Sequence, residues 1–263
     1  MDLGLKGARV LVTAASEGLG AATARQFSLE GCFVVINSRD LGKLQQTAQS
    51  IAKESGNPVF TQAADLTNSE SASKMVRNSA ESMGGLDILV TNAGGPPSGS
   101  FADFDIDAWQ TATQLTLMSA VSLIHASLPH LRKSRRAAIL TITSLSAKQP
   151  VPNLILSNTI RPAVIGLTKS LATELGSEGI RVNSILPGMT QTARIDDIMQ
   201  ARAEQSGTSP EHELEKAAAT IPLRRIGTVA EFANAAVFLC SPAAGYITGV
   251  SLPVDGGTIQ ATM

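Results

Sequence analysis

Short runs of aliphatic and β-branched residues alternate along the chain with segments of helical length, and this alternation constrains the fold more than any other feature. The runs are ARVLVTA, CFVVINS, LDILVTNAG, AAILTITS, IRVNSILPG and a final GVSLPVDGG. Short apolar runs of this kind are typical of parallel strands that are buried on both faces. Strands that alternate with helices form a doubly wound parallel sheet. The sequence therefore predicts an α/β Rossmann-like fold with helices on both faces of the sheet.

The segments between these runs carry the signals of amphipathic helices. Leu19, Thr23 and Phe27 recur at a spacing of four residues, which indicates the first helix. Further helices are predicted from about Leu41 to the turn at Gly56, over residues 69–83 and 108–131, and behind the capping-box pair of Thr228 and Glu231.

The chain of 263 residues is predicted to form one domain, 1–263, because it shows no linker, repeat or low-complexity segment. Residues 193–222 interrupt the alternation with many charges and a Gly-Thr-Ser-Pro turn. This segment directly follows a predicted strand, where α/β proteins place the loops that cover ligands. We therefore predict a substrate lid around 193–222; an ordinary pair of surface helices is the alternative.

Composition excludes several classes of partner. A formal net charge of −1 provides no basic face for nucleic acid, and the densest cationic run, Arg132–Arg136, is read as a solvated helix end. No stretch has the roughly 18 apolar residues that span a bilayer, and the N-terminus reaches its first strand too soon for a secretory signal. Cys32 and Cys240 lack metal-site spacing and are interpreted as buried free thiols of a reducing compartment. The sequence thus predicts a cytoplasmic protein with no metal, membrane or nucleic-acid partner.

A glycine-rich turn, TAASEGLG, joins the first predicted strand to the first helix. In that place, backbone N–H groups and the positive end of the helix can approach a diphosphate. Gly18 and Gly20 stand at the later glycine positions, whereas Ala14 stands at the first. Alanine resists a positive φ, so a slightly wider turn is expected. Dinucleotide binding is favoured over a purely structural turn.

Together with TAASEGLG, the segments ADLT, TNAGG, ILPGMTQT and IPLRRIGTVAEFANAAVFLCSPAAGYITGVSLPVDGG occur in one order along nearly the whole chain. In these motifs the chain resembles the short-chain dehydrogenase/reductase family, and most of all the 3-oxoacyl-carrier-protein reductases. The resemblance implies a sheet of about seven strands, a homotetramer or homodimer, and NAD or NADP as cofactor. It also implies that the cofactor is bound by Thr13, Ser16, Gly18, Leu19, Asp65, Leu66, Asn92, Ala93, Gly94, Pro187, Gly188 and Thr190.

The end of the second strand discriminates between the two cofactors. A carboxylate there would accept a hydrogen bond from the ribose 2′-OH of NAD, whereas an arginine accommodates a 2′-phosphate. The sequence has Ser38 followed by Arg39, which favours NADP(H). Glu17 and Asp40 argue in the other direction, so NAD stays an alternative.

The catalytic positions depart from the family pattern. The resemblance implies a serine at Ser144, followed by a tyrosine and a lysine at positions that hold Ser157 and Arg161, and an asparagine where Thr116 stands. The only tyrosine, Tyr246, lies in a different motif. Arg161 stays protonated, so it can contact the nicotinamide ribose or stabilise a developing alkoxide but cannot act as a base.

The source of the proton is left open by the sequence. Lys148, His125, His130 and His212 are the titratable candidates, and water relayed by Ser144 and Ser157 is another. Pro162 suggests that the catalytic helix begins at Asn158 with Ser157 as its N-cap, because proline is tolerated only in a first turn.

Two functions are weighed on these residues, and a third, another reaction class such as elimination or isomerisation in the same cleft, is not excluded by the fold alone. The first is an NADP(H)-dependent oxidoreductase that interconverts a ketone and a secondary alcohol by hydride transfer, with an altered set of proton-relay residues. The second is a cofactor-binding regulatory or scaffold protein with little redox activity. Ser144 and the cation at position 161 favour the enzyme.

Overall fold

The computed structural model describes residues 2–262, which form a parallel sheet of seven strands. The strand order is β3-β2-β1-β4-β5-β6-β7. All six pairings in the sheet are parallel. The strands are β1 (Arg9–Val12), β2 (Phe33–Ser38), β3 (Val59–Ala63), β4 (Ile88–Thr91), β5 (Ala138–Ile142), β6 (Arg181–Pro187) and β7 (Ser251–Val254). The prediction of a doubly wound α/β fold is confirmed.

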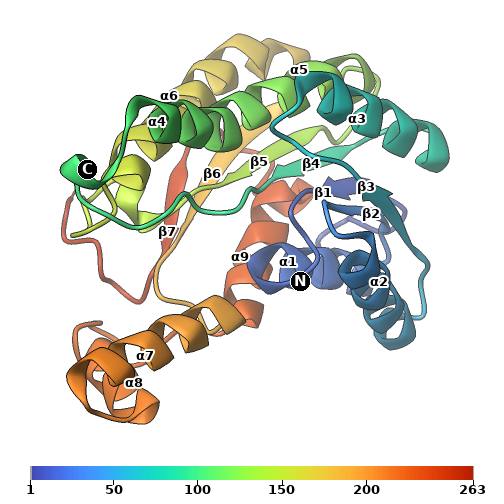
Figure 1. The fold of residues 1–263 in the computed structure, drawn as a ribbon. Helices are drawn as coiled ribbons and strands as arrows, with labels where there is room; N and C mark the ends of the chain where they lie inside the picture. The colour runs from blue at the N-terminus through green and yellow to red at the C-terminus, as the bar shows by residue number, and fades with distance from the viewer. Residues whose placement is uncertain (1, 263) are drawn as a thin grey trace.

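Helices cover both faces of this sheet (Figure 1). One face is packed by α1 (Gly18–Leu29), α2 (Leu41–Ser55) and α9 (Val229–Cys240). The other is packed by α3 (Ser69–Met83), α5 (Ser119–Leu131) and α6 (Ile155–Leu175), with α4 (Ile106–Thr113) beside α6. Within β1, Val10 and Val12 join the first core and Leu11 the second, as the twofold alternation of a strand requires. The inner strands are therefore buried on both sides, which explains their continuous apolar runs.

Local sequence signals set most helix ends. Asp40, Asn68 and Thr228 accept a hydrogen bond from the third residue of α2, α3 and α9, respectively. Gly56 and Gly84 adopt left-handed conformations (φ 72° and 69°) at the ends of α2 and α3. The capping box of Thr228 and Glu231 is confirmed.

Two elements differ from the sequence prediction. No strand was specified over Val59–Ala63; β3 lies at the edge of the sheet with an alternating, half-exposed pattern, so it lacks the apolar run of the inner strands. The helix predicted over 108–131 begins at Ile106 and contains a π-helical turn, Gln114–Met118, between α4 and α5. Such π turns are frequent at functional sites.

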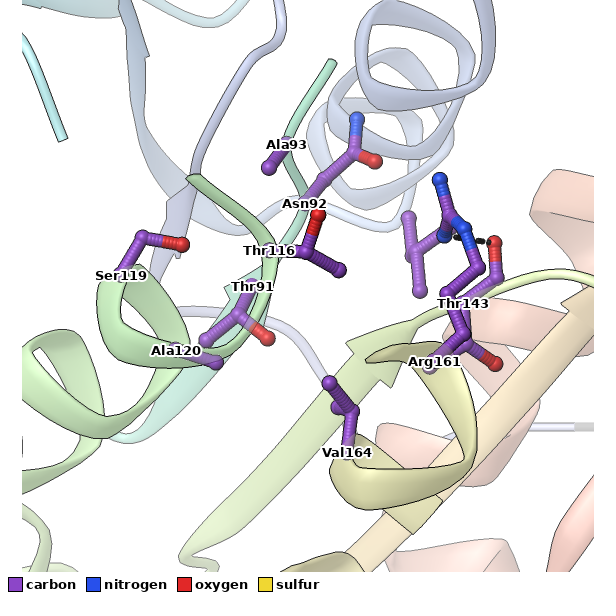
Figure 2. A pocket seen from close by; sticks show the side chains of 10 residues that line it. Thr91, Asn92, Ala93, Thr116, Ser119, Ala120, Thr143, Arg161 and Val164 are labelled. Atoms are coloured by element: carbon purple, nitrogen blue, oxygen red, sulfur yellow. Dashed lines mark hydrogen bonds between the residues drawn. The ribbon is translucent and has the colours of Figure 1, made fainter. Parts of the chain in front are cut away.

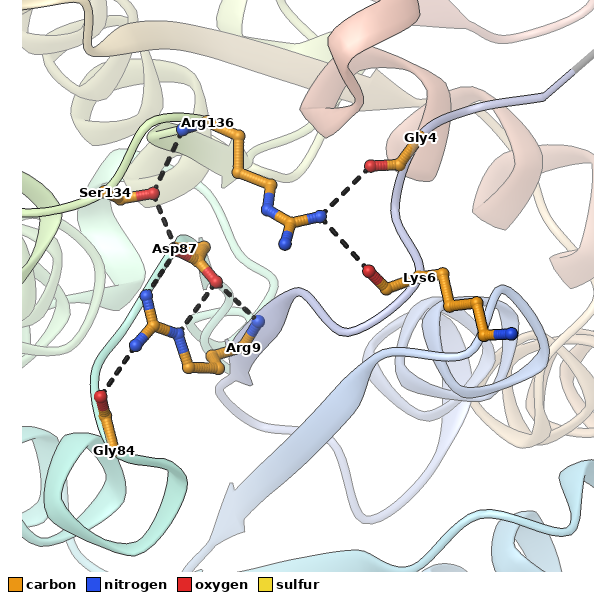
Figure 3. A network of polar contacts seen from close by, with 7 residues as sticks. All are labelled: Gly4, Lys6, Arg9, Gly84, Asp87, Ser134 and Arg136. Carbon is orange, nitrogen blue, oxygen red and sulfur yellow. Dashed lines mark hydrogen bonds and ion pairs between the residues drawn. The ribbon is translucent and has the colours of Figure 1, made fainter.

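A polar network on the opposite edge of the sheet from the strand carboxyl ends ties β1 to β4 (Figure 3). Asp87 is 3% exposed and accepts hydrogen bonds from the Arg9 backbone, the Arg9 guanidinium and Ser134 at 2.6–2.9 Å. Burial alone would raise the pKa of Asp87, but these hydrogen bonds outweigh it and hold the pKa at about 2. Arg136, from the cationic run, donates to the carbonyls of Gly4 and Lys6. This network is structural.

The segment predicted as a lid contains α7 (Ala193–Ser206) and α8 (Pro210–Ala219). These two helices pack mainly against each other and project from the layered body (Figure 1). Among residues 2–262 no helix is both long enough and apolar enough to cross a membrane.

Candidate functional site

The carboxyl ends of β1 and β4 meet at the centre of the sheet, where the strand order changes direction. Open α/β sheets bind ligands in the crevice at this switch point. Thr13, which follows β1, donates from Oγ1 to the carbonyl of Asn92 at 2.8 Å and accepts from the Asn92 backbone N–H at 2.8 Å. The Asn92 side chain in turn donates to the carbonyl of Ala14 at 3.1 Å. These hydrogen bonds join the two loops that are predicted to bind the cofactor.

The glycine-rich turn has the geometry of a phosphate cradle. A Cβ on Gly20 would lie 2.4 Å from the carbonyl oxygen of Ala14, so only glycine fits there. The N-cap of α1, Glu17, makes no side-chain cap, and the first turn of α1 holds no acidic residue. Its N–H groups are therefore available to a diphosphate. The wider turn expected at Ala14 is wrong, because Ala14 adopts a positive φ of 46° and keeps the tight conformation.

At the end of β2, Arg39 is exposed and free of ion pairs among the described residues. Both acidic residues that argued for NAD have other partners. Asp40 accepts from the Lys43 backbone as the cap of α2, and Glu17 lies 3.8 Å from the Lys43 ammonium. Ser38 donates to the carbonyl of Asp40 at 3.0 Å. A cation and a small hydroxyl therefore stand at the end of β2, and the carboxylates of Asp40 and Glu17 contact Lys43.

The neighbouring loop after β3 carries Asp65 and Leu66. Hydrogen bonds from the Thr67 backbone and side chain lower the pKa of Asp65, and the charge of Arg39 adds to the effect. Asp65 thus lies within electrostatic reach of Arg39, and Leu66 is buried beneath it at 7% exposure. Both positions border the end of β2 that precedes Arg39.

The end of β6 closes the other side of the cleft. Pro187 is the last residue of β6, and a Cβ on Gly188 would lie 2.6 Å from Cα of Asp255. Thr190 is buried at 5% exposure and forms a bridge with Gly227. Gly188 therefore packs against the segment that follows β7, and Thr192 lies opposite Gly18, with its Cγ2 3.8 Å from the place of a Cβ there.

The catalytic helix α6 begins earlier than predicted. Asn158 N–H donates to the carbonyl of Leu154 at 2.8 Å, so helical hydrogen bonding is established before Asn158. Ser157 therefore lies inside α6 and is not its N-cap; Leu154 is. Pro162 lies within α6 and is exposed to solvent. Because proline has no backbone N–H, the helix loses one hydrogen bond at this residue. Because Ser157 and Arg161 are four residues apart on one helix, they share a face.

Arg161 reaches from α6 to the end of β5. Its Nη1 donates to the carbonyl of Thr143 at 2.6 Å, directly before Ser144. Ser144 caps the short 3₁₀ turn Leu145–Ala147 by accepting from the Ser146 backbone at 3.2 Å. Burial lowers the pKa of Arg161 to about 10, and the positive charge of Arg194 acts in the same direction. Arg161 therefore stays a cation at neutral pH.

A small pocket lies between α6, the π turn and the carboxyl ends of β4 and β5 (Figure 2). Its cavity volume is about 20 Å³, which is room for about one water molecule. Two buried polar atoms in its wall, Thr116 Oγ1 and Arg161 Nε, lack a hydrogen-bond partner in the described chain. Its lining consists of Thr91, Asn92, Ala93, Thr116, Ser119, Ala120, Ile142, Thr143, Arg161 and Val164. Buried polar groups without partners are rare, so these two atoms mark a place for a ligand or water.

The pocket unites only some of the predicted residues. Arg161, Asn92 and Ala93 line it. Ser144 and Ser157 are not among the lining residues; Ser144 follows Thr143 in the chain, and Ser157 lies one turn before Arg161 in α6. Gly94 continues the same loop. The titratable proton candidates are not in its lining, and Tyr246 is fully exposed elsewhere. Among residues 2–262 no cluster of three or more His, Cys, Asp or Glu could hold a metal ion.

Sequence reasoning did not assign a role to Thr91, Thr143, Ser119 or Arg194. Thr91 and Thr143 lie at the carboxyl ends of β4 and β5. They could have been found from the sequence, because ligands bind at the carboxyl ends of parallel strands. The position of Ser119 at the pocket depends on the preceding π turn, which no sequence pattern predicts. Arg194 lies in the segment of irregular periodicity, where no pattern indicates the direction of its side chain.

Comparison with known proteins agrees with this geometry. The family described as Enoyl-(Acyl carrier protein) reductase matches residues 13–258. The Bos taurus protein "Dehydrogenase/reductase SDR family member 4" is 32% identical over 253 residues, covering 95% of this chain and 86% of its own. L-Sorbose reductase from Gluconobacter frateurii, solved in complex with NADPH and L-sorbose, has a TM-score of 0.96 at 32% identity, covering 99% of this chain and 100% of its own.

One further solved structure is similar in a way that bears on the catalytic positions. It is an NADPH-bound short-chain oxidoreductase from Pseudomonas aeruginosa PAO1 described as containing an atypical catalytic center. It is 29% identical with a TM-score of 0.89, and the match covers 98% of this chain and 100% of that one.

Proposed function

The chain belongs to the short-chain dehydrogenase/reductase family, and we propose that this oxidoreductase interconverts a ketone and a secondary alcohol with a proton relay that does not use tyrosine. The cofactor is NADP(H), as in the NADPH complexes of its structural neighbours. The observation that carries the proposed reaction is Arg161, a cation that lines the pocket at the switch point of the sheet and whose buried Nε has no hydrogen-bond partner in the described chain.

The residues in the cleft fit a dinucleotide. The uncapped N-terminus of α1 and the Gly20 cradle suit the diphosphate, and Arg39 with Ser38 suits a 2′-phosphate. We propose that Thr13, Ser16, Gly18 and Leu19 hold the diphosphate side, Asp65 and Leu66 the adenine, and Asn92, Ala93 and Gly94 the adenosine ribose side. Pro187, Gly188 and Thr190 would hold the nicotinamide. When bound, NADP(H) supplies or accepts a hydride at its nicotinamide ring.

Arg161 would stabilise the negative charge that develops on the carbonyl oxygen during reduction. A preorganised guanidinium in a partly dry cleft is suited to that task. Its hydrogen bond to Thr143 and its packing on α6 hold it in one position. In reduction the carbonyl carbon would gain the hydride that NADPH supplies, and the oxygen would gain a proton beside Arg161.

The proton would reach the carbonyl oxygen from water. The pocket has room for about one water, and Thr116 and Arg161 are both among the residues that line it. We propose that Ser144, next to Thr143 in the chain, and Ser157, one turn before Arg161, pass this proton on, because a hydroxyl both donates and accepts. This relay would replace the acidic phenol that the cleft lacks.

The structure also carries features that concern a lid, the compartment and the assembly. We propose that α7 and α8 form a lid over the cleft, since they follow β6 and project from the body. Two buried free cysteines, with pKa values raised to about 12 mainly by burial, suit the reducing cytoplasm. The exposed apolar side chains of Phe101, Ile106 and Leu223 suit contacts in a homo-oligomer, either a dimer or a tetramer.

Titration of the purified protein with NADPH and NADH, followed by nicotinamide fluorescence, tests the proposed function. We expect tighter binding of NADPH, and then its consumption at 340 nm with members of a panel of ketones, diketones and 3-oxoacyl thioesters. Binding without consumption across the panel would support the alternative of a cofactor-binding regulatory or scaffold protein, which the missing tyrosine favours.

The choice of cofactor predicts a selective effect of Arg39. Arg39→Ala removes the cation at the end of β2, so the Kd of NADPH should rise about 10-fold, the size of one charge-assisted hydrogen bond. The Kd of NADH should change less than about 2-fold, because NADH has no 2′-phosphate. Lys53→Ala, in the last turn of α2 at the far end of that helix from Arg39, removes an equal charge away from the end of β2 and is the control. Equal losses for both cofactors would refute the role of Arg39 in selectivity.

A further inference from the structure

Two arginines from distant parts of the chain converge on the cleft. Arg194 is the second residue of α7, and its Nη1 lies 2.6 Å from the place that a Cβ on Gly95 would take. Gly95 directly follows the Asn92–Gly94 loop that borders the pocket. The Arg194 guanidinium therefore lies against the loop after β4, and residues of that loop line the pocket together with Arg161.

Neither arginine has an anionic partner in the described chain. The ion pairs of residues 2–262 include neither Arg161 nor Arg194, and no carboxylate lines the pocket. Arg161 donates to one carbonyl only, and its buried Nε has no acceptor. Burial lowers the pKa of Arg161 most, and the charge of Arg194 acts in the same direction. Two cations with free donors, one in the pocket lining and one against the loop that lines it, can form a site for an anion.

We propose that the cleft takes a substrate that carries a carboxylate, held between Arg161 and Arg194, so that the enzyme acts on oxo acids and hydroxy acids. A planar guanidinium matches a carboxylate with two parallel hydrogen bonds, which suits Arg194. The inference rests on the proposed function for the place of the reacting carbonyl, which would lie beside Arg161.

The position of the pair favours a substrate anion over the diphosphate of the cofactor. The turn that fits the diphosphate, with Gly18 and Gly20, has the uncapped end of α1 to receive it. The residue that lies opposite Gly18 is Thr192, not Arg194. An anion that contacts both arginines would instead lie near the pocket of Thr116 and Arg161. Because Arg194 begins α7, such an anion would also connect the proposed lid to the body of the fold.

A binding experiment that does not depend on turnover tests the anion site. The NADPH complex of the protein is titrated with malonate, an unreactive dicarboxylate, and with dimethyl malonate, its neutral ester. We expect malonate to bind and the ester not to bind, and Arg194→Ala to weaken malonate binding at least 10-fold. Arg202→Ala removes an exposed arginine of the same helix and should leave binding unchanged. Equal binding of malonate by both variants and the wild type, or no binding by the wild type, would overturn the proposal.

Two further measurements separate the outcomes. If Arg194→Ala raises the Kd of NADPH at least 10-fold, the anion is a phosphate of the cofactor and the substrate proposal is overturned. With 3-oxobutanoate and its methyl ester as substrates, Arg194→Ala should lower kcat/KM at least 10-fold for the acid and less than 3-fold for the ester. Malonate binding that depends on Arg194, without turnover of any substrate, would uphold the anion site and defeat the proposed hydride transfer.

Discussion

Replacing Arg161 by alanine is expected to lower kcat by about 100-fold, the cost of removing one preorganised donor from the site of a developing oxyanion. Arg161 is the cation in the pocket lining, and its Nε is buried there without a partner. The KM of the substrate should change less than kcat, because the charge it stabilises develops only in the transition state. Steady-state kinetics with saturating NADPH measure both constants.

The pH profile distinguishes this role from a merely structural one. The pKa of Arg161 is lowered to about 10, so its charge is present at neutral pH and is lost as the pH rises through that value. Turnover of the wild type should therefore fall near pH 10, and Arg161→Lys should retain part of the activity with a fall at a different pH. Arg77→Ala, on the exposed surface of α3, is the matched control and should behave as the wild type. A kcat for Arg161→Ala within 3-fold of the wild type would remove Arg161 from the mechanism.

Replacing Asp87 by asparagine is expected to lower the free energy of unfolding by about 3 kcal/mol, the lower end of the range for breaking a buried ion pair. Asp87 is 3% exposed and holds Arg9 and Ser134 in the network of Figure 3. In a chain of this size the midpoint of thermal unfolding should fall by roughly 6–12 °C. Differential scanning calorimetry measures the shift. Glu178→Gln breaks the exposed pair with Arg132 and, as control, should cost less than about 1 kcal/mol.

The same carboxylate predicts how stability depends on pH. Its folded pKa of about 2 lies below the ordinary value of 3.8, so its contribution is complete above pH 4. As the pH falls through about 2 this contribution is lost, and at about 1.4 kcal/mol per pKa unit it amounts to roughly 2 kcal/mol. Asp87→Asn should abolish this component of the acid dependence. A thermal shift for Asp87→Asn no larger than that of Glu178→Gln would contradict the assigned structural role.

The fold could be predicted from the sequence because a strand that is buried on both faces consists of a continuous run of apolar residues. Inner strands such as β4 are buried on both faces, so every position is apolar or small, and the run is visible without further information. The edge strand β3 has no such constraint and was not specified. The start of α6 was predicted too late, because proline was expected only in the first turn of a helix. In the folded protein Pro162 lies inside α6 and is exposed to solvent.

The candidate site could be predicted from the sequence only where it follows from the order of the strands in the sheet. Thr13 and Asn92 follow adjacent parallel strands, whose carboxyl ends must share one edge of the sheet. The meeting of Thr116 with Arg161 requires the packing of the π turn against α6, and no local pattern encodes that contact. The approach of Arg194 to Gly95 requires the direction of α7 as it leaves the sheet. These pairings are properties of the tertiary structure.

Transfer of deuterium from NADPH labelled at both C4 positions of the nicotinamide tests the central claim most directly. The wild-type protein is incubated with labelled NADPH and the carbonyl substrate that it consumes fastest, and the product is analysed by mass spectrometry. We predict an alcohol with one deuterium on the carbinol carbon, formed in equal amount to NADP⁺, at a rate that falls about 100-fold in Arg161→Ala. Bound NADPH with no deuterated alcohol above the level of a protein-free control would contradict hydride transfer by this site.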